Sequence, residues 1–277
     1  MSTNLKAKLN QLLQSTPPHT VILSSWLVKR GYSLDLQKKY KKNNWLESVG
    51  YGAMKRSGDD IDYLSGIYAI QSQANLKIHI GAQSALSLLG KSQYLELSDK
   101  PTIKLFSIKN NDLPLWFKNY HWNINISFNI ASFLPSDLGL SDYSVHNNFK
   151  VKISTPARAI MECIHLASNN QDYIECYESM EGLNNLNPRT VQLLLENCSS
   201  IKIKRMFLEK GITFCELKLE GCMNWPLQIA HRHKRVYYKD KPELLYDFGE
   251  VALACQLCHS KIEGDRELTE EVFNKIR

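Results

Sequence analysis

The spacing of apolar residues predicts that the chain begins with helices. Four leucines recur at helical spacing and give a helix over residues 4–15 one apolar stripe: Leu5, Leu9, Leu12 and Leu13. The Pro-Pro pair at 17–18 ends this helix, because proline lacks an amide donor and restricts the residue before it. A second, short helix is predicted to start at Ser24 or Ser25, which are good N-cap residues, and to end at Gly31.

The next segment predicts a third helix and a hairpin. The helix is expected to run from its N-cap Ser33 to about Asn43, and only a tight turn separates it from the helix before it, which is typical of a helix-turn-helix. Two short extended runs, residues 45–49 and 53–56, flank a Gly-Tyr-Gly turn and predict a two-stranded hairpin. A helix-turn-helix followed by such a wing is the winged-helix pattern.

Beyond residue 58, strand and helix patterns alternate. We expect strands at residues 77–80, 102–108, 124–128 and 149–153, and helices at residues 59–71, 81–89, 113–118, 155–164, 173–180, 188–196 and 201–209. The sequence therefore predicts an α+β protein, with a winged-helix domain and its trailing helices over residues 1–95. A mixed α/β domain is predicted over residues 96–277, although the pattern beyond Cys215 indicates no clear element.

The composition is that of a folded protein. Hydrophobic residues make up 43% of the 277 residues, which supplies a core and excludes a disordered chain. No apolar run reaches the roughly 18–20 residues needed to cross a bilayer, and the N-terminus has no apolar stretch of the signal-peptide kind. We therefore expect a cytoplasmic protein with no membrane partner. The seven cysteines are an odd number without a secretory signal, which favours reduced thiols.

Positive charge gathers near the N-terminus. Residues 1–58 contain ten Lys or Arg against Asp35 and Glu47, so 10 − 2 gives +8, whereas the whole chain carries +6. This imbalance favours a polyanion as partner of the N-terminal domain, with nucleic acid as the leading candidate. A solvated lysine face is the alternative, and the charge alone does not decide between them.

The helix after Ser33 is the candidate recognition helix, because an α-helix fits the major groove, which is about 12 Å wide. Four side chains are predicted to face the groove: Ser33, Gln37, Lys38 and Lys41. Four others are predicted to contact phosphates: Lys39, Lys42, Lys55 and Arg56. The apolar side chains around them are expected in the core: Trp26, Leu27, Leu34, Tyr40, Trp45 and Leu46. The alternative is a winged helix that contacts protein, with its lysines solvated.

Two clusters near the C-terminus, a pair of cysteines and a basic run, are expected to be structural features and not functional sites. Cys255 and Cys258, followed by His259, have the spacing of a haem attachment or of half a zinc site. No second pair of ligands lies nearby in sequence, although Cys222, His231 and His233 offer ligands if the fold brings them close. We therefore expect thiols on a helix, no metal and no cofactor. The basic run at residues 231–235 is expected to be solvated surface, with a nucleic-acid contact as the alternative.

The remaining polar clusters also indicate structure rather than catalysis. Arg158 lies among alanines and isoleucines and is expected to pair with Glu162, one helical turn further on. Asp59, Asp60 and Asp62 favour the start of a helix over a metal-binding nuclease site. The sequence contains no P-loop, no G-x-S-x-G, no H-E-x-x-H and no G-x-G-x-x-G motif. We therefore expect that the protein is not an enzyme.

Several stretches resemble the AbiEi family of antitoxins. The N-terminal stretches, which resemble the family's winged-helix domain, are residues 23–27, 30–33, 44–46, 50–56, 69–71, 78–81, 84–86 and 89–90. The second domain adds residues 154–162, 193–196 and 198–208. The resemblance covers roughly residues 5–210. The tail from Gly221 onward departs from the ending that the family shows.

This resemblance implies an antitoxin of a type IV toxin–antitoxin, abortive-infection system. Such a protein represses its own operon by binding inverted repeats in the promoter. Its second domain counters a nucleotidyltransferase-like toxin without forming a stable complex with it. The alternative is a nucleic-acid-processing enzyme or an RNA-binding protein that uses the winged helix as an accessory module, and a third reading is an interaction scaffold.

Overall fold

The computed structural model describes residues 2–92, 100–108, 111–183, 186–200, 203, 215–223, 227–241, 244 and 249–276. Contacts between residues divide the chain into two compact units that interleave along the sequence. The first unit comprises residues 1–80, 97–131 and 140–153, and the second comprises residues 81–96, 132–139 and 154–277. The predicted boundary between residues 95 and 96 lies outside the described residues, so a single division there stays a prediction.

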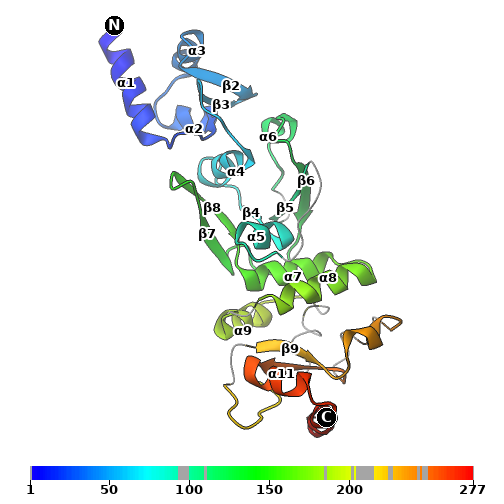
Figure 1. Ribbon diagram of the computed structural model, residues 1–277. Coiled ribbons are helices and arrows are strands. Elements are labelled where there is room, and N and C mark those ends of the chain that lie inside the picture. Colours follow the sequence, from blue (N-terminus) through cyan, green and yellow to red (C-terminus); the bar gives the residue numbers. More distant parts are fainter. Residues whose placement is uncertain are drawn as a thin grey trace. The chain divides into compact units, whose positions relative to one another are not determined.

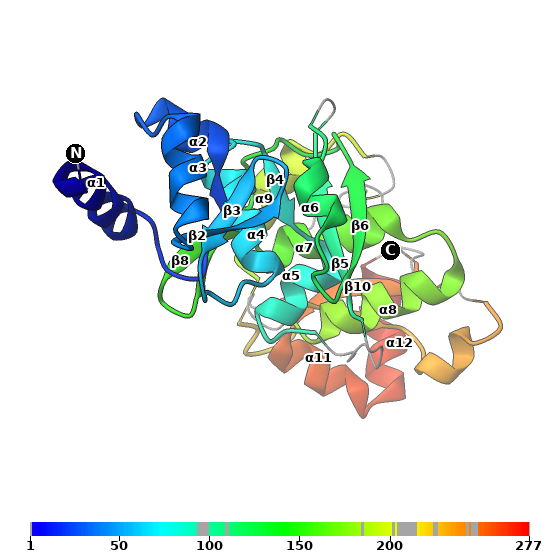
Figure 2. The same ribbon diagram turned by 90° about the horizontal axis from the view of Figure 1, so that it is seen from above.

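The first unit begins with a winged helix (Figure 1). Its elements are α1 (Ser2–Ser15), β1 (Ile22–Leu23), α2 (Ser24–Lys29), α3 (Leu34–Lys42), β2 (Leu46–Gly50) and β3 (Ala53–Arg56). The strands form an antiparallel sheet in the order β1-β3-β2, with Ile22 opposite Met54. Helix α3 lies beside the β2–β3 hairpin in both views (Figures 1 and 2). The helix-turn-helix and wing that the sequence predicts are confirmed.

Large apolar side chains hold this module together. Leu12, Ile22, Leu27 and Tyr40 are fully buried in one cluster. The ring of Tyr40 also packs against that of Trp45, with 5.6 Å between their centroids. Burying one such side chain stabilises a fold by about 1.5–3 kcal/mol. The winged helix therefore has a core of its own, built from a few bulky residues.

The rest of the first unit is a five-stranded mixed sheet with two helices. Its strands are β4 (Ile78–Ile80), β5 (Thr102–Ser107), β6 (Asn125–Ile130), β7 (Leu140–Val145) and β8 (Phe149–Ser154), in the order β6-β5-β4-β8-β7. Strand β4 runs antiparallel to β5 and parallel to β8, and β5 runs parallel to β6. The sequence predicts four of these strands and misses β7.

The two helices of this region are α4 (Tyr63–Ser72) and α6 (Leu115–Asn119). Helix α4 begins later than the predicted start at Asp59 and Asp60, because Asp62 is its N-cap and accepts a hydrogen bond from the Ser65 N–H at 2.9 Å. The Asp59 carboxylate instead accepts a hydrogen bond from the backbone N–H of His19.

Two glycines allow the aromatic residues of α6 to pack closely against strand β2 and helix α4. A Cβ on Gly50, at the end of β2, would lie 2.9 Å from the Cβ of Trp116, and a Cβ on Gly66 of α4 would lie 2.8 Å from Phe117. Real Cβ atoms essentially never come so close, so these contacts require glycine. The wing strand β2 and helix α4 therefore both rest on α6, which fixes the wing within its own unit.

The second unit contains α5 (Ala82–Leu88), α7 (Pro156–Leu166), α8 (Asn170–Glu181) and α9 (Pro188–Glu196), and α7 packs against the other three. The expected pair of Arg158 and Glu162 is confirmed, with 2.8 Å between Nε and Oε1 and side chains that are 4% and 0% exposed. The second Glu162 oxygen accepts hydrogen bonds from the Ala82 N–H and the Ser154 hydroxyl. Most of the predicted helix at residues 201–209 lies outside the described residues.

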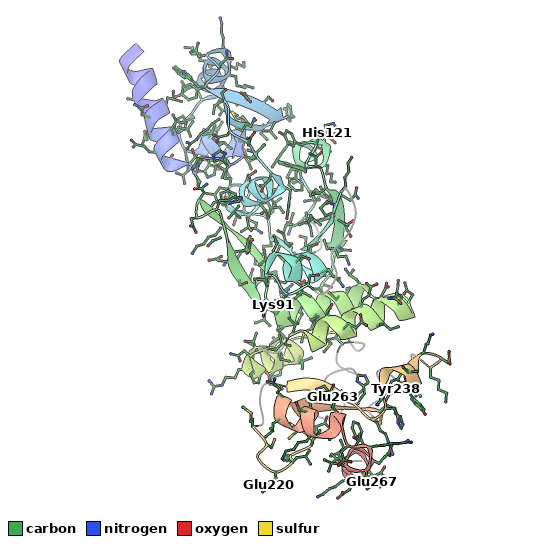
Figure 3. The ribbon with its side chains drawn as sticks, in the orientation of Figure 1. Lys91, His121, Glu220, Tyr238, Glu263 and Glu267 are labelled. Carbon is green, nitrogen blue, oxygen red and sulfur yellow. The ribbon has the colours of Figure 1, made fainter. Side chains whose placement is uncertain are left out.

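Among its described residues, the C-terminal part of the second unit has five elements, of which the sequence indicates one, the helix at Cys255 and Cys258. They are β9 (Leu227–His231), the 3-10 helix η1 (Arg235–Tyr238), β10 (Val251–Cys255), α11 (Gln256–Glu263) and α12 (Arg266–Lys275). Strands β9 and β10 pair in antiparallel fashion, and Tyr238, labelled in Figure 3, marks η1. In the described part of the chain, no helix is both long enough and apolar enough to span a bilayer.

Candidate nucleic-acid interface

Helix α3 has one buried side and one side covered with lysines. Gln37 and Tyr40 are buried, whereas the four lysines Lys38, Lys39, Lys41 and Lys42 are exposed. Successive helical residues turn by about 100°, and the partly buried Leu36 also belongs to the buried side, so Lys38 and Lys42 point most directly away from it. Lys39 and Lys41 flank them. The Asp35 carboxylate lies 3.7 Å from Lys38, and both of these side chains are more than three-quarters exposed, so this pair is weak.

Two of the predicted groove-facing residues of α3 have structural contacts. Ser33 is exposed and caps the helix, since its Oγ accepts a hydrogen bond from the Leu36 N–H at 3.3 Å. Gln37 is only 2% exposed. Its Oε1 accepts a hydrogen bond from the Ser24 hydroxyl at 2.6 Å, and its Nε2 donates to the backbone oxygen of Tyr32 at 2.9 Å. This corrects the prediction for Gln37, because its amide joins α2 to α3 and does not face outward.

The two basic residues of the wing are also engaged. Lys55 Nζ donates to the backbone oxygen of Asp59 at 2.7 Å and lies 3.4 Å from the Glu47 carboxylate. Arg56 Nη2 donates to the backbone oxygens of Leu13 and Thr16, where α1 ends. The phosphate contacts of Lys55 and Arg56 stay a prediction, and in this structure the charged groups of both residues bind to backbone oxygens of the winged helix and its flanking segment.

The sequence interpretation missed two exposed residues beside the lysines. Tyr51 at the tip of the wing is 99% exposed, and Gly52 next to it has a φ of +77° that closes the hairpin turn. Leu34 in the first turn of α3 is 58% exposed, so its assignment to the core is wrong. An aromatic residue between two turn glycines is the sequence signal that could have identified Tyr51. The other predicted core residues, Trp26, Leu27, Tyr40, Trp45 and Leu46, are buried or partly buried.

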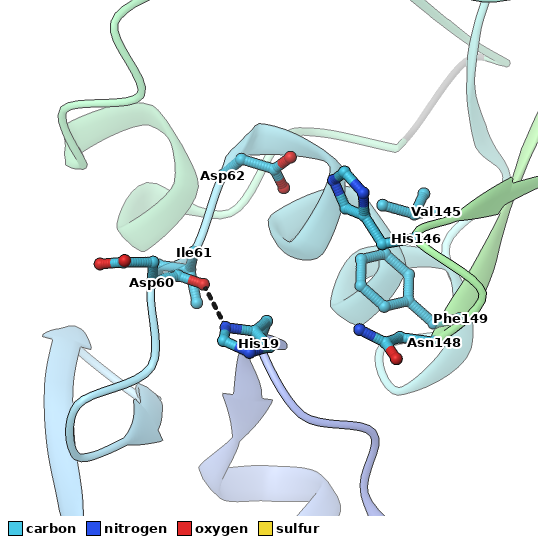
Figure 4. Close-up of a pocket in the computed structure, with 8 residues that line it drawn as sticks. All are labelled: His19, Asp60, Ile61, Asp62, Val145, His146, Asn148 and Phe149. Carbon is cyan, nitrogen blue, oxygen red and sulfur yellow. Dashed lines mark hydrogen bonds between the residues drawn. The ribbon is translucent and has the colours of Figure 1, made fainter.

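A cavity of about 400 Å³ in the first unit is a second candidate site (Figure 4). It is lined by His19, Asp60, Ile61, Asp62, Val145, His146, Asn148 and Phe149. The polar groups that line it also have structural contacts. His19 Nδ1 lies 3.1 Å from the backbone oxygen of Asp60, and Asp62 caps α4. The expected capping by this acidic cluster is confirmed for Asp62.

In the second basic run, at residues 231–235, Arg232 and His233 lie close to carboxylates of their own unit. Arg232 pairs with Glu270 through both Nε and Nη2, and the Arg232 N–H groups hold the pKa of the Glu270 carboxyl below its usual value. His233 Nε2 lies 3.6 Å from Glu250. Of the residues that the structure describes, a single group is suited to a metal ion, namely Cys215, Cys222, Cys255 and Cys258.

Comparisons with known proteins bear on both domains. Residues 5–97 match the family model of the N-terminal domain of AbiEi antitoxin transcriptional regulators, and residues 100–212 match that of AbiEi antitoxin transcriptional regulators of type IV toxin–antitoxin systems. No curated protein matches the sequence. The chain is similar to the crystal structure of the RV2827C protein from Mycobacterium tuberculosis, with 13% identity and a TM-score of 0.44 over 71% of this chain and 72% of that chain.

Proposed function

This chain belongs to the AbiEi family of type IV toxin–antitoxin transcriptional regulators, and we propose that it represses its own operon by placing α3 in the major groove of promoter DNA. The observation that carries this proposal is the outward face of α3, where four lysines lie exposed and one weakly paired carboxylate opposes them. Lysines on a helix narrow enough for the groove supply both phosphate attraction and donors for base edges.

The directions of the side chains on α3 support a division of the proposed contacts. Lys38 and Lys42 are proposed to face the groove, because they point away from the buried side of the helix, while Lys39 and Lys41 contact the flanking phosphates. Tyr51 on the wing tip is proposed to touch the neighbouring backbone. One winged helix covers one half-site, so an inverted repeat takes two copies of the chain.

The antitoxin part of the proposal concerns residues 96–277. They are proposed to counter a nucleotidyltransferase-like toxin without a stable complex and without catalysis, as the family resemblance implies. The buried Arg158–Glu162 pair fits a structural function, because both of its members are engaged within the fold. A regulator of its own genome works where the DNA is, so we propose the cytoplasm as its location.

DNA binding is tested with a fluorescently labelled fragment of the gene's own upstream region. We expect binding that weakens steeply with salt, since log K falls by about 0.9 per phosphate contact for each unit of log salt. The variant Lys38→Glu/Lys42→Glu is expected to lose affinity on the order of 100-fold. The matched control Lys118→Glu/Lys150→Glu reverses two exposed lysines outside the winged helix and should bind as the parent does. Equal affinity of the two variants would overturn the proposal.

Toxin neutralisation is tested separately by co-expression with the adjacent toxin gene. The variant Lys38→Glu/Lys42→Glu is expected to rescue growth as well as the parent while it fails to repress a promoter reporter. Loss of rescue by this folded variant would contradict the division of labour between the two domains.

A further inference from the structure

Four cysteines of the C-terminal segment converge, although they come from separate elements. Cys215 and Cys222 lie at the two ends of a loop that Glu220 marks in Figure 3. Cys255 is the N-cap of α11, and Cys258 lies in the first turn of that helix. The four sulfur atoms all lie within 4.8 Å of one another, and Cys222 Sγ is 3.8 Å from Cys255 Sγ.

These distances fit one metal ion at the centre of a tetrahedron. A zinc–sulfur bond of about 2.3 Å places the sulfur atoms of a tetrahedral site about 3.8 Å apart. A disulfide requires about 2.05 Å between sulfurs, so the Cys222–Cys255 separation is that of two ligands and not of a bonded pair. An iron–sulfur cluster would insert iron and sulfide between the thiolates and hold them further apart.

Contacts other than the thiols already hold the loop in place. The Glu216 N–H donates to the backbone oxygen of Leu253 at 2.8 Å, and the Leu253 N–H donates back to the Glu216 carboxylate at 2.6 Å. Lys261 on α11 donates to the backbone oxygen of Glu220 at 2.7 Å. The loop also turns sharply, with a φ of +75° at Gly221. The ligand positions are therefore fixed by the hairpin and by α11 before any ion binds.

Part of the surroundings of the sulfur atoms favours negative charge. Cys255 and Cys258 lie at the N-terminal end of α11, where the helix dipole favours negative charge. Backbone N–H groups also donate to the sulfurs: those of Cys255 and Lys218 to Cys215, and those of Cys258 and Met223 to Cys255. Such hydrogen bonds offset part of the charge that four thiolates bring to a buried site.

Ordinary apolar packing explains this cluster less well. Free cysteine often serves as a small buried hydrophobe, and six of the ten buried residues in this core are Ala or Cys, with Phe273 the one aromatic residue. Among the residues that the structure describes, each of these small side chains buries little apolar surface. The other three cysteines, Cys163, Cys176 and Cys198, are buried as well, yet they join no such group in the described part of the chain.

We propose that Cys215, Cys222, Cys255 and Cys258 bind one Zn²⁺ ion as a structural site. Four protein ligands close the coordination sphere, which is the form of a structural and not a catalytic zinc site. Four soft thiolates select zinc over magnesium or calcium. The ion ties the loop at residues 215–223 to the β9–β10 hairpin and α11. The site lies beyond residue 212, where the family match ends, so it does not depend on the proposed DNA binding.

The first experiment measures the metal content of the full-length protein, purified under reducing conditions without chelator. We expect about one zinc per chain by plasma mass spectrometry in the parent protein. The double variant Cys215→Ser/Cys258→Ser is expected to lose it. The control Cys163→Ser changes a buried cysteine outside the group, whose Sγ donates to Gln83 Oε1 at 3.1 Å, and should keep its zinc.

A second measurement covers the case in which the double variant fails to fold. The parent protein is stripped of metal and titrated with Co²⁺, and we expect the intense absorption of tetrahedral thiolate coordination to saturate at about one equivalent and to disappear when zinc is added. Iron in place of zinc in the purified protein, the absence of the cobalt absorption, or a Cys222–Cys255 disulfide in protein kept reduced would each overturn the proposal.

Discussion

The two basic runs of this chain, residues 38–42 and 231–235, look alike in sequence and differ in their surroundings. On α3, four lysines are exposed and the nearby Asp35 is itself 85% exposed. In the second run, Arg232 pairs with Glu270, and its Nη2 also donates to Asn274 Oδ1 at 2.9 Å. The lysines of α3 therefore keep their charge exposed, whereas the charge of Arg232 is paired within its own unit.

Arg158 extends this comparison to full burial. Its guanidinium is 4% exposed, pairs with Glu162 and donates to the backbone oxygen of Pro135 at 2.7 Å. The basic residues thus form a series from exposed lysines through a half-buried arginine to an enclosed one. Along this series the contribution to folding rises, whereas the charge that remains available to an external partner falls. Each of the following substitutions changes one of these basic residues, a carboxylate that pairs with one of them, or a residue on the buried side of α3.

The largest effect on folding is expected from Glu162→Gln. The substitution leaves the Arg158 charge buried without its partner and places an amide group where a carboxylate accepts from Ala82 and Ser154. Breaking such a buried pair costs about 3–5 kcal/mol. Urea unfolding measures the loss, with the exposed Glu196→Gln as control. Equal midpoints for the two variants would contradict the structural function of the pair.

A smaller loss is expected from Gln37→Ala, which probes the buried side of α3. The substitution removes the partner of the Ser24 hydroxyl and of the Tyr32 backbone oxygen. Leaving buried polar groups without partners costs about 1–3 kcal/mol. Affinity for the operator, measured where the variant is fully folded, should stay close to that of the parent. A stable variant with lost affinity would instead restore Gln37 as a groove-facing residue.

A loss of about 1 kcal/mol is expected from Glu270→Gln, because it removes a charge-assisted hydrogen bond that is only partly shielded from water. The pKa of the Glu270 carboxyl is held low by Arg232, so its contribution is present above the unfolded-state pKa and disappears as the pH falls through the folded-state pKa. The parent and the variant should therefore differ in urea midpoint at pH 7 and converge in acid. A difference that is constant with pH would contradict this origin.

The winged helix was predictable from sequence because its signals are local. The residues that start and end α2 and α3, such as Ser33 and Gly31, lie at the ends of these helices. The residues of the turn between β2 and β3 likewise lie next to the two strands of the hairpin. The contacts of Arg56 were not predictable in this way, because the groups that accept its hydrogen bonds, Leu13 and Thr16, lie about forty residues earlier in the chain.

The cysteine group was not predictable for a related reason. Cys255 and Cys258 are three positions apart in sequence, but Cys215 and Cys222 reach them only through the contacts of the loop with β10 and α11. The spacing of cysteines along the chain identifies two of the four residues. The other two are brought to them by contacts between segments that are distant in sequence. The same limit applies to Arg232, whose partner Glu270 lies on α12.

The smallest effect on folding, and the sharpest test of the comparison, is expected from Lys38→Gln/Lys42→Gln. Both side chains extend into solvent, so the urea midpoint should not change measurably. If each lysine displaces one condensed cation from DNA, the slope of log K against log salt becomes less negative by about two. Arg232→Gln removes a cation of the second run and should leave that slope unchanged, because the charge of Arg232 is already neutralised by Glu270. A slope that changes equally in both variants would mean that carboxylate pairing does not decide which basic run meets the DNA.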